Sequence, residues 1–286
     1  MSNEMDEFYN TSLSLGHSIS RDGKENCLPK RIPLRSKKFG KLSQFCDDPV
    51  HKLDWAVNID AVRVSMLQLG NSMKPKGWVD AWLINVFCRK LFRDNHPSKT
   101  KKHFFFNTIS DFFLEKWKSE EAKDIWHKRA LESFIGANRA FKLHLSNALF
   151  FPSIYNRHWF VLLIDIKYCN FIFLDSYFSE DSTFHKTVGD VMIQNFIKTW
   201  HEAGLKEMNF QTYGRAYPNV PKQITGNDCG VFVMKFMEVF VARNQSKCNF
   251  SHLDIPLFRV KYTHDILMSR HNMERDAKDL ASMFEC

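Results

Sequence analysis

The sequence predicts an α+β fold in which helices pack on a central sheet. Two consecutive apolar runs of strand type, residues 158–166 (HWFVLLIDI) and 170–175 (NFIFLD), indicate the sheet. Apolar residues at helical spacing over 78–92, and an almost wholly apolar segment over 231–240, indicate helices that pack on it. The chain has 286 residues, of which 44% are hydrophobic, so a sizeable core can be buried.

The first residues differ in composition from the rest. They are rich in Ser, Asn, Lys and Arg with few periodic apolar positions, so we predict a disordered extension over residues 1–50 and one domain over 51–286. Residues 30–41 (KRIPLRSKKFGK) hold six basic side chains in twelve positions. This cluster is a candidate nuclear-import signal or a contact for an acidic surface, and a solvated charged tail is the simpler interpretation.

The elements of the domain follow the periodicity of its apolar residues. After the helix at 78–92 we expect, in chain order, a strand at 104–106, helices at 109–117 and 120–137, the strand pair, a helix at 183–203, a strand at 211–213 and a helix at 228–242. Asp111 and Ser119 are candidate caps for the two middle helices. The short polar break between the two central strands predicts a hairpin.

Charge and cysteine content narrow the classes of function. The formal net charge of +8 favours an acidic partner, either nucleic acid or an acidic protein. The seven cysteines form no CxxC pair and have no ligand-like spacing with histidines, which argues against structural zinc. Their odd number argues against a disulfide framework and favours a reducing compartment. Since no secretory signal and no membrane-length apolar run are visible, we expect a soluble intracellular protein.

Three side chains fall where an acyl-transfer site needs them. His158 opens the first strand of the hairpin and Asp175 closes the second, so both lie at the same end, where a carboxylate can orient an imidazole. Cys229 lies between Gly226 and Gly230 at the start of the apolar helix. Because a cysteine at a helix N-terminus gains thiolate character, we predict Cys229 as a nucleophile.

A glutamine upstream of this cysteine is a candidate oxyanion donor. Gln223 lies six residues before Cys229, and its side-chain amide and the Cys229 backbone N–H could together hold a developing oxyanion. Each residue alone has a simpler interpretation. His158, Asp175 and Gln223 could be caps or surface groups, and Cys229 an inert buried thiol.

The combined pattern is far more specific than its parts. Here the chain resembles the C-terminal catalytic domain of the ubiquitin-like-specific proteases, the SUMO (sentrin) protease family, over roughly residues 75–270. The segments that carry the resemblance are HWFVLLIDI with LDS at 158–176, QITGNDCGVFVMKFM at 223–237, FFPSIYNRHW at 150–159 and DIPLFRVKYTHDIL at 254–267.

The resemblance implies a papain-like α+β fold with a central mixed sheet flanked by helices. In this fold the helix that carries the nucleophile packs against the sheet that carries the histidine and the aspartate. It implies that His158 is the base, Asp175 the orienting carboxylate and Cys229 the nucleophile. It places Gln223 in the oxyanion hole. No metal and no organic cofactor is implied.

The resemblance also implies a narrow tunnel between two tryptophans, through which a Gly-Gly tail is threaded. Trp159, directly after the histidine, matches one of them. Trp78 is our choice for the other because it lies at the start of the predicted helix, and Trp82 is the alternative.

The implied activity is cleavage after the C-terminal Gly-Gly of a ubiquitin-like modifier, SUMO above all, in precursor processing, deconjugation or both. The expected partners are the modifier and its conjugates, and no nucleic-acid partner is expected. The protein is expected to be a monomer in the nucleus and/or the cytoplasm. The alternatives are a deneddylase-type protease, an acetyltransferase that uses the same Cys-His pair, and a non-catalytic protein derived from a mobile element. The last alternative is opposed by the presence of all four site residues, Cys229, His158, Asp175 and Gln223.

Overall fold

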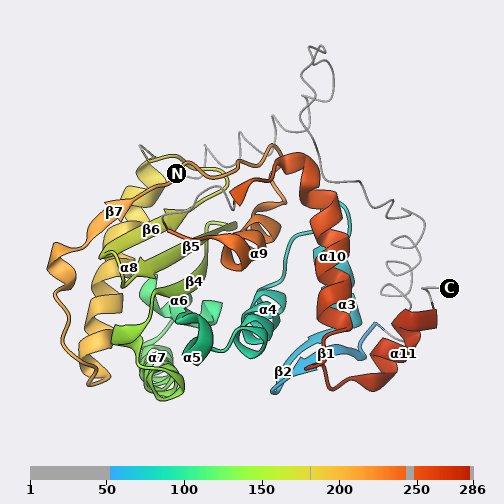
Figure 1. Cartoon of the computed structure of the whole chain (residues 1–286), viewed down its shortest axis with the longest axis horizontal. Helices are drawn as coiled ribbons and strands as arrows, with labels where there is room; N and C mark the ends of the chain where they lie inside the picture. Colours follow the sequence, from blue (N-terminus) through green and yellow to red (C-terminus); the bar gives the residue numbers. More distant parts are fainter. Residues whose placement is uncertain (1–51, 181, 243–247, 284–286) are drawn as a thin grey trace, which may run out of the picture.

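The computed structural model describes residues 52–180, 182–242 and 248–283. The predicted extension over 1–50, with its basic cluster, lies outside the described residues. Figure 1 shows a sheet in the middle of the domain with helices on both sides, as the sequence predicts.

The central sheet has the strand order β3-β4-β5-β6-β7. Its strands are β3 (Lys102–Phe104), β4 (Ala148–Tyr155), β5 (His158–Asp165), β6 (Asn170–Leu174) and β7 (Gly214–Ala216). The strands β4, β5 and β6 are antiparallel neighbours, whereas β3 and β7 join the two edges in parallel. The sheet is therefore mixed, and the predicted hairpin of β5 and β6 is confirmed.

Helices cover both faces of this sheet, which explains why β5 is apolar on both sides. They are α4 (Ala81–Asp94), α6 (Asn107–Phe113), α7 (Glu120–Ala140), α8 (Thr183–Glu202) and α9 (Cys229–Val239). Trp159 and Val161 of β5 belong to the buried cluster that contains α4 and α9. Phe160 and Leu162 belong to the second cluster, with α6, α7 and α8. One strand thus holds two cores together.

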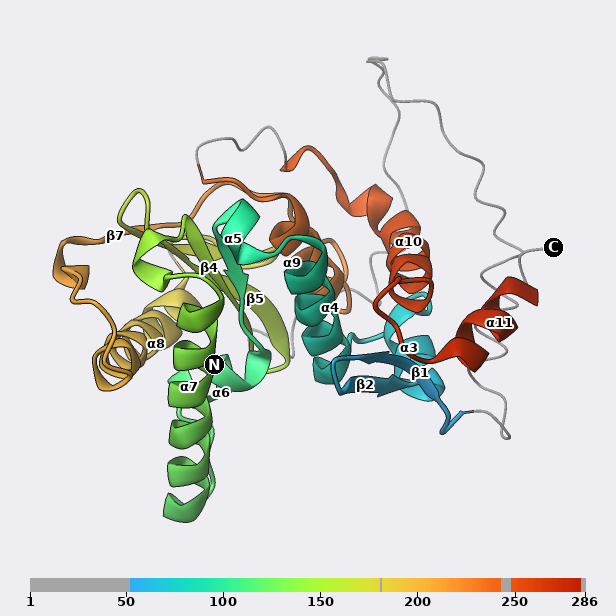
Figure 2. The same ribbon diagram turned by 60° about the horizontal axis from the view of Figure 1, so that its bottom comes forward.

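A smaller layer lies beside α4, on the side away from α8 (Figure 2). It consists of β1 (Trp55–Ile59), β2 (Val62–Ser65), α3 (Met66–Met73), α10 (Ile255–Leu267) and α11 (Arg275–Met283). The short helices of the described chain are α5 (Pro97–Thr100), η1 (Leu143–Leu145), η2 (Phe210–Thr212) and η4 (His252–Asp254). The β1–β2 hairpin is antiparallel.

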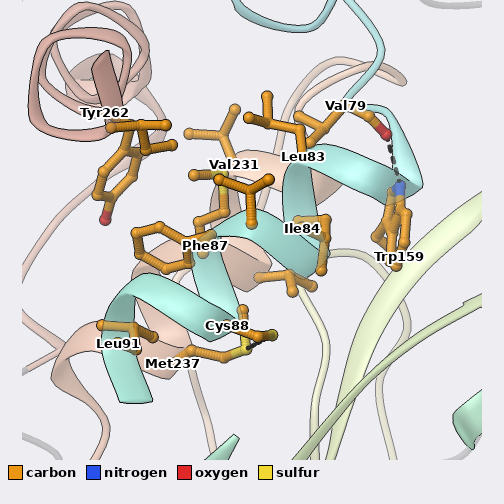
Figure 3. Packing of buried hydrophobic residues seen from close by; sticks show 14 of the residues in the cluster. Val79, Leu83, Ile84, Phe87, Cys88, Leu91, Trp159, Val231, Met237 and Tyr262 are labelled. Carbon is orange, nitrogen blue, oxygen red and sulfur yellow. Dashed lines mark hydrogen bonds between the residues drawn. The ribbon is translucent and has the colours of Figure 1, made fainter. Parts of the chain in front are cut away.

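The helix α4 packs between α9 and α10 through one buried row (Figure 3). Leu83, Phe87 and Leu91 repeat every four residues and are buried, and the Phe87 ring meets Tyr262 of α10 edge-on at 5.2 Å between centroids. The helix begins at Ala81 rather than at residue 78, because the Asp80 side chain accepts a hydrogen bond from the backbone N–H of the second helical residue at 2.7 Å.

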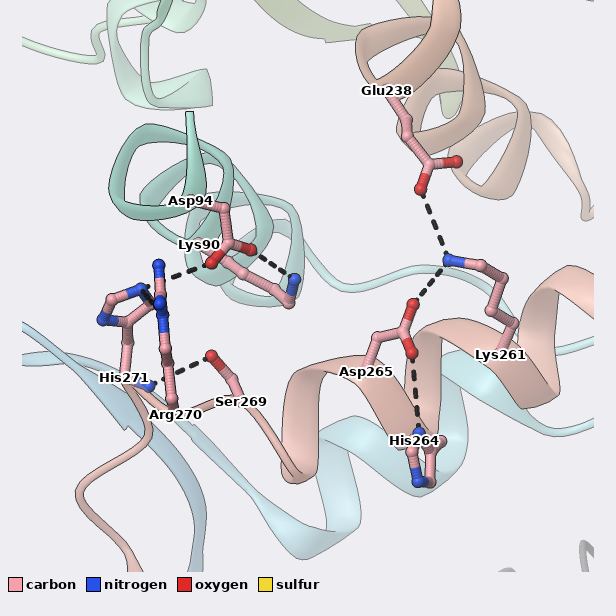
Figure 4. A network of polar contacts seen from close by, with 9 residues as sticks. All are labelled: Lys90, Asp94, Glu238, Lys261, His264, Asp265, Ser269, Arg270 and His271. Carbon is pink, nitrogen blue, oxygen red and sulfur yellow. Dashed lines mark hydrogen bonds and ion pairs between the residues drawn. The ribbon is translucent and has the colours of Figure 1, made fainter. Parts of the chain in front are cut away.

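Ion pairs near the surface join α9 to α10, and α4 to the segment that follows α10 (Figure 4). Lys261 Nζ lies 3.3 Å from Glu238 Oε1 and 2.5 Å from Asp265 Oδ2. His271 Nε2 lies 3.3 Å from Asp94 Oδ1. Exposed pairs contribute about 0–1 kcal/mol each, so the buried rows dominate the packing of these helices.

Several predicted element ends are corrected by the structure. The strand expected at 211–213 is wrong, because the buried Phe210 starts a 3-10 turn there and β7 begins only at Gly214. The strand expected at 104–106 lies at β3, two residues earlier. The last predicted helix, α9, ends at Val239.

The two candidate caps have opposite outcomes. Asp111 lies inside α6, where its Oδ1 is 2.7 Å from Lys116 Nζ, so it is not a cap; the N-cap is Phe106. Ser119 is confirmed as the N-cap of α7, since its hydroxyl accepts from Ala122 N at 3.2 Å.

Candidate active site

The hairpin brings His158 and Asp175 together at one end of the sheet. His158 Nε2 lies 2.8 Å from Asp175 Oδ1, and both side chains are buried. The same Oδ1 also accepts the backbone N–H groups of Tyr177 and Phe178, at 2.7 and 2.9 Å. Three donors therefore hold one carboxylate oxygen, and the turn that follows β6 supplies two of them.

The electrostatics of this pair favour its charged form. Burial alone would lower the pKa of His158, but the Asp175 carboxylate, its hydrogen bond and the Cys229 side chain together raise that pKa to about 10. Burial acts to raise the pKa of Asp175, yet the charge and hydrogen bond of His158 hold it below its ordinary value. The pair is thus an imidazolium and a carboxylate over the neutral pH range.

Cys229 is the first residue of α9 and is buried, at 1% exposure. The Cys229 side chain is one of the groups that raise the pKa of His158, which places the sulfur beside that imidazole. Because Nε2 of that imidazole faces Asp175, the remaining nitrogen, Nδ1, is the one available to the sulfur. The helix N-terminus adds unpaired N–H groups and a positive dipole end, which favour a negative charge at this position.

Contacts with Ser176 fix Gln223 and occupy the oxygen of its side-chain amide, but not the Nε2 group. Its Oε1 accepts the Ser176 hydroxyl at 2.7 Å, and its backbone N–H donates to the Ser176 carbonyl at 2.7 Å. With the oxygen occupied, the Nε2 group is free to donate to a substrate. Sequence reasoning missed Ser176 as a supporting residue, although it follows Asp175 in the LDS segment.

Lys222 is a second supporting residue that the sequence did not reveal. Its Nζ donates to the backbone oxygens of Asp175 and Phe178, at 2.9 and 2.7 Å. Burial lowers its pKa, and the nearby Asp175 carboxylate opposes that effect. Together with Gln223, it fastens the turn after β6 to the loop before the helix of the cysteine.

The loop before α9 is fixed by a buried arginine from α10. Arg259 Nη2 lies 2.6 Å from Asp228 Oδ1 and also donates to the carbonyls of Gly77 and Asn227, at 2.9 and 3.2 Å. Its Nη1 donates to the Ser72 carbonyl at 2.7 Å. The position directly before the cysteine is therefore tied to a distant turn of the chain.

The three candidate tryptophans lie in different surroundings. Trp159 is 1% exposed, and its Nε1 donates to the Val79 carbonyl at 3.1 Å (Figure 3). Trp78, next to that contact, is half-buried, and the Arg157 guanidinium lies 5.8 Å from its ring centroid. Trp82 is 55% exposed on the first turn of α4. Trp78 lies before the helix, not at its first residue, because Asp80 caps it.

The described part of the chain contains four free cysteines: Cys88, Cys169, Cys229 and Cys248. Within the same residues, no group of three or more His, Cys, Asp or Glu side chains is placed to hold a metal ion. A search of the described helices finds none with the length and apolar character to cross a membrane.

Residues 78–271 match the protein family described as the Ulp1 protease family, C-terminal catalytic domain. Among curated proteins, the chain is 25% identical over 199 residues to ubiquitin-like-specific protease 1A of Arabidopsis thaliana, which covers 68% of this chain and 38% of the relative. It is 24% identical over 200 residues to human sentrin-specific protease 2, covering 68% and 31%. The chain thus spans less than two thirds of the length of these relatives.

Solved structures agree in fold. The C-terminal Ulp1 protease domain, solved in complex with Smt3, the yeast ortholog of SUMO, has a TM-score of 0.61 at 16% identity and covers 83% of this chain and 97% of its own. The catalytic domain of the Ulp1-like SUMO protease of Chaetomium thermophilum has a TM-score of 0.55 at 14% identity, covering 82% and 90%.

Proposed function

We propose that this chain, which belongs to the Ulp1 protease family, is a cysteine protease that cleaves after the C-terminal Gly-Gly of a ubiquitin-like modifier, SUMO first among them. The observation that carries the proposal is the buried chain of contacts from Cys229 through His158 to Asp175. An acyl-transfer nucleophile, its base and an orienting carboxylate need this order of contacts.

The reaction proceeds in two acyl-transfer steps. The Cys229 thiolate attacks the carbonyl carbon of the terminal glycine, and the C–N bond breaks as His158 gives its proton to the leaving amine. The modifier is then held as a thioester. His158 next takes a proton from water, whose oxygen attacks the thioester and releases the modifier's carboxylate and the Cys229 sulfur. The leaving amine belongs to a peptide in processing and to a target lysine in deconjugation.

The oxyanion of each step is held by two donors. The Gln223 Nε2 group is one and the Cys229 backbone N–H is the other. The supporting observation is the Ser176 hydroxyl on Gln223 Oε1, which keeps the side chain from turning its oxygen toward the oxyanion. A donor fixed before the reaction loses no energy in reorienting, which is why such groups stabilise a transition state well.

The Gly-Gly requirement is assigned to Trp159 and Trp78. Trp159 directly follows the base, and its indole is anchored to the residue after Trp78. An aromatic wall on each side leaves room for a backbone without a Cβ, so only glycine passes. Trp82 is the weaker candidate because more than half of its surface faces solvent on α4.

SUMO is the first modifier to test because of the names of the relatives: sentrin-specific protease 2 and a Ulp1 domain solved with the yeast ortholog of SUMO. The test is hydrolysis of a SUMO precursor fusion by the wild type, by Cys229→Ala and by Cys169→Ser, whose thiol is exposed and outside the site. We expect cleavage by the wild type and Cys169→Ser and none by Cys229→Ala. Full cleavage by Cys229→Ala would show that Cys229 is not the nucleophile.

A further inference from the structure

A second histidine faces Asp175 from the side opposite to His158. His185, in the first turn of α8, has its Nε2 3.5 Å from Asp175 Oδ2. Both side chains are almost wholly buried, at 1% and 2% exposure. The carboxylate thus lies between two imidazoles, one at each oxygen.

The two carboxylate oxygens are unequally satisfied. Oδ1 of Asp175 accepts three hydrogen bonds, from His158 and from the N–H groups of Tyr177 and Phe178. Oδ2 is buried and accepts no hydrogen bond of ordinary length from any described residue. A buried charged oxygen without a donor is unfavourable, and His185 Nε2 is the polar atom that faces it.

The surroundings of His185 make it a neutral donor. Its ring lies 5.5 Å from that of Phe173 and 5.1 Å from that of Tyr217. The ionisable groups that act on it are Asp175, His158 and Lys222, and the Phe178 carbonyl is a second acceptor beside its ring. Burial outweighs the Asp175 charge and the Phe178 hydrogen bond, so the pKa of His185 lies below its ordinary value. A neutral imidazole can donate to Oδ2 without competing with His158 for the carboxylate charge.

We propose that His185 is a positioning residue whose Nε2–H donates to Asp175 Oδ2 and so keeps Oδ1 aimed at His158. With both oxygens held, the carboxylate cannot turn about its Cβ–Cγ bond, and the imidazole of His158 keeps its orientation toward Cys229. His185 lies behind Asp175 and acts through it. Its effect on turnover rests on the proposed protease function, whereas its hydrogen bond does not.

Loss of the donor has a defined consequence. A carboxylate that can turn holds the His158 imidazolium less well, so the pKa of His158 falls and the alkaline limb of the activity profile moves to lower pH. We expect a shift of about one pH unit and a fall in kcat of about tenfold, smaller than the roughly 100-fold of a 1 Å displacement of the reacting groups. KM should stay unchanged, because His185 does not touch substrate.

The test compares three variants in kinetics on a SUMO precursor fusion. His185→Phe removes the donor and keeps an aromatic ring, His185→Gln restores an amide N–H near the place of Nε2, and His103→Phe is the matched control. His103 is also a buried histidine, at 2% exposure, and burial lowers its pKa to about 4, but it lies on β3 beside Phe141.

The expected result is a lower kcat and a shifted alkaline limb in His185→Phe, recovery in His185→Gln, and a wild-type profile in His103→Phe. A wild-type profile in His185→Phe would overturn the proposal. An equal loss in His103→Phe would also overturn it, since the effect would then be one of general core packing.

Nuclear magnetic resonance of the imidazole nitrogens gives a readout that does not depend on enzymatic activity. In the wild-type protein the proposal requires the His185 proton on Nε2, and a proton on Nδ1 alone would refute it. The titration of His158 in His185→Phe should move down by the same unit as the activity profile. If the wild type cleaved no modifier, the proposed function would fail, but this nitrogen measurement would still decide the role of His185.

Discussion

At the scale of single residues, the site depends on groups that fix other groups. The Ser176 hydroxyl occupies Gln223 Oε1, and the Lys222 ammonium binds the carbonyl of Asp175. Neither touches the place where substrate reacts. Each restricts a side chain or a turn whose orientation decides whether a proton or an oxyanion finds its partner.

Removing the oxyanion donor should lower kcat more than removing the residue that supports it. Gln223→Ala should lower kcat about 10–1000-fold, the range for loss of one oxyanion-hole donor. Ser176→Ala should lower kcat less, because the amide remains and only its orientation is freed. Steady-state kinetics measures both. A Gln223→Ala enzyme with wild-type kcat would remove Gln223 from the site.

The pH dependence of stability follows from the His158–Asp175 pair. The pKa of His158 is raised from 6.5 to about 10 in the folded protein. Its contribution to stability is thus fully present below pH 6.5 and is lost as pH rises through about 10. The free energy of unfolding should fall over this window, and in Asp175→Asn the fall should be smaller. Denaturant titrations across the window test this, and an equal slope in both proteins would contradict the assignment.

At the scale of elements, the helix α9 must approach both the sheet and the segment before α4 closely for Cys229 to meet His158. Gly230 permits this approach, since a Cβ there would lie 2.5 Å from Val79 Cβ and 3.3 Å from Trp159 Cδ1. Gly230→Ala should therefore destabilise the protein by about 1–3 kcal/mol and lower activity. Gly136→Ala is the control, because a Cβ at Gly136 on α7 would meet nothing within 4 Å. Thermal unfolding of both variants should separate them.

The buried arginine of α10 should matter far more than the exposed lysine beside it. Arg259→Met removes the guanidinium partner of the buried Asp228 carboxylate, which keeps only the Thr225 hydroxyl and the more distant His252, and should cost about 3–5 kcal/mol. Lys261 lies on the same helix, and Lys261→Ala breaks its exposed ion pairs with Glu238 and Asp265. This change should cost about 0–1 kcal/mol. Denaturant unfolding compares the two, and equal losses would refute the view that Arg259 fixes the loop before Cys229.

At the scale of the whole molecule, the sequence predicted the strands and helices that consist of long apolar runs. The strands β5 and β6 and the helix α9 are such runs, and the chemistry-bearing residues lie at their ends. The β1–β2 hairpin and the strand β4 were not predicted, because β2 has only four residues and the apolar run of β4 is interrupted by Pro152, a residue that usually argues against a strand interior.

Contacts between residues far apart in the chain could not be predicted from the sequence either. Arg259 meets the Ser72 carbonyl across 187 positions, and Ser176 meets Gln223 across 47. His185 stands in a helix without any motif to single it out. No local pattern reports such pairs, since they arise only when distant elements pack. The disordered extension over residues 1–50 and its import signal remain predictions, because they lie outside the described residues.

Covalent capture of the nucleophile tests the proposed protease site and its preference for SUMO most directly. SUMO, ubiquitin and Nedd-type modifiers, each with a C-terminal electrophile, are incubated with the full chain at equal concentration, and the modified residue is identified by mass spectrometry. We expect the SUMO probe to react fastest, the adduct to be on Cys229, and Cys229→Ala to remain unlabelled. Faster labelling by the ubiquitin or Nedd-type probe would contradict the SUMO assignment, and an adduct on another cysteine, or none on the folded protein, would contradict the proposed protease site.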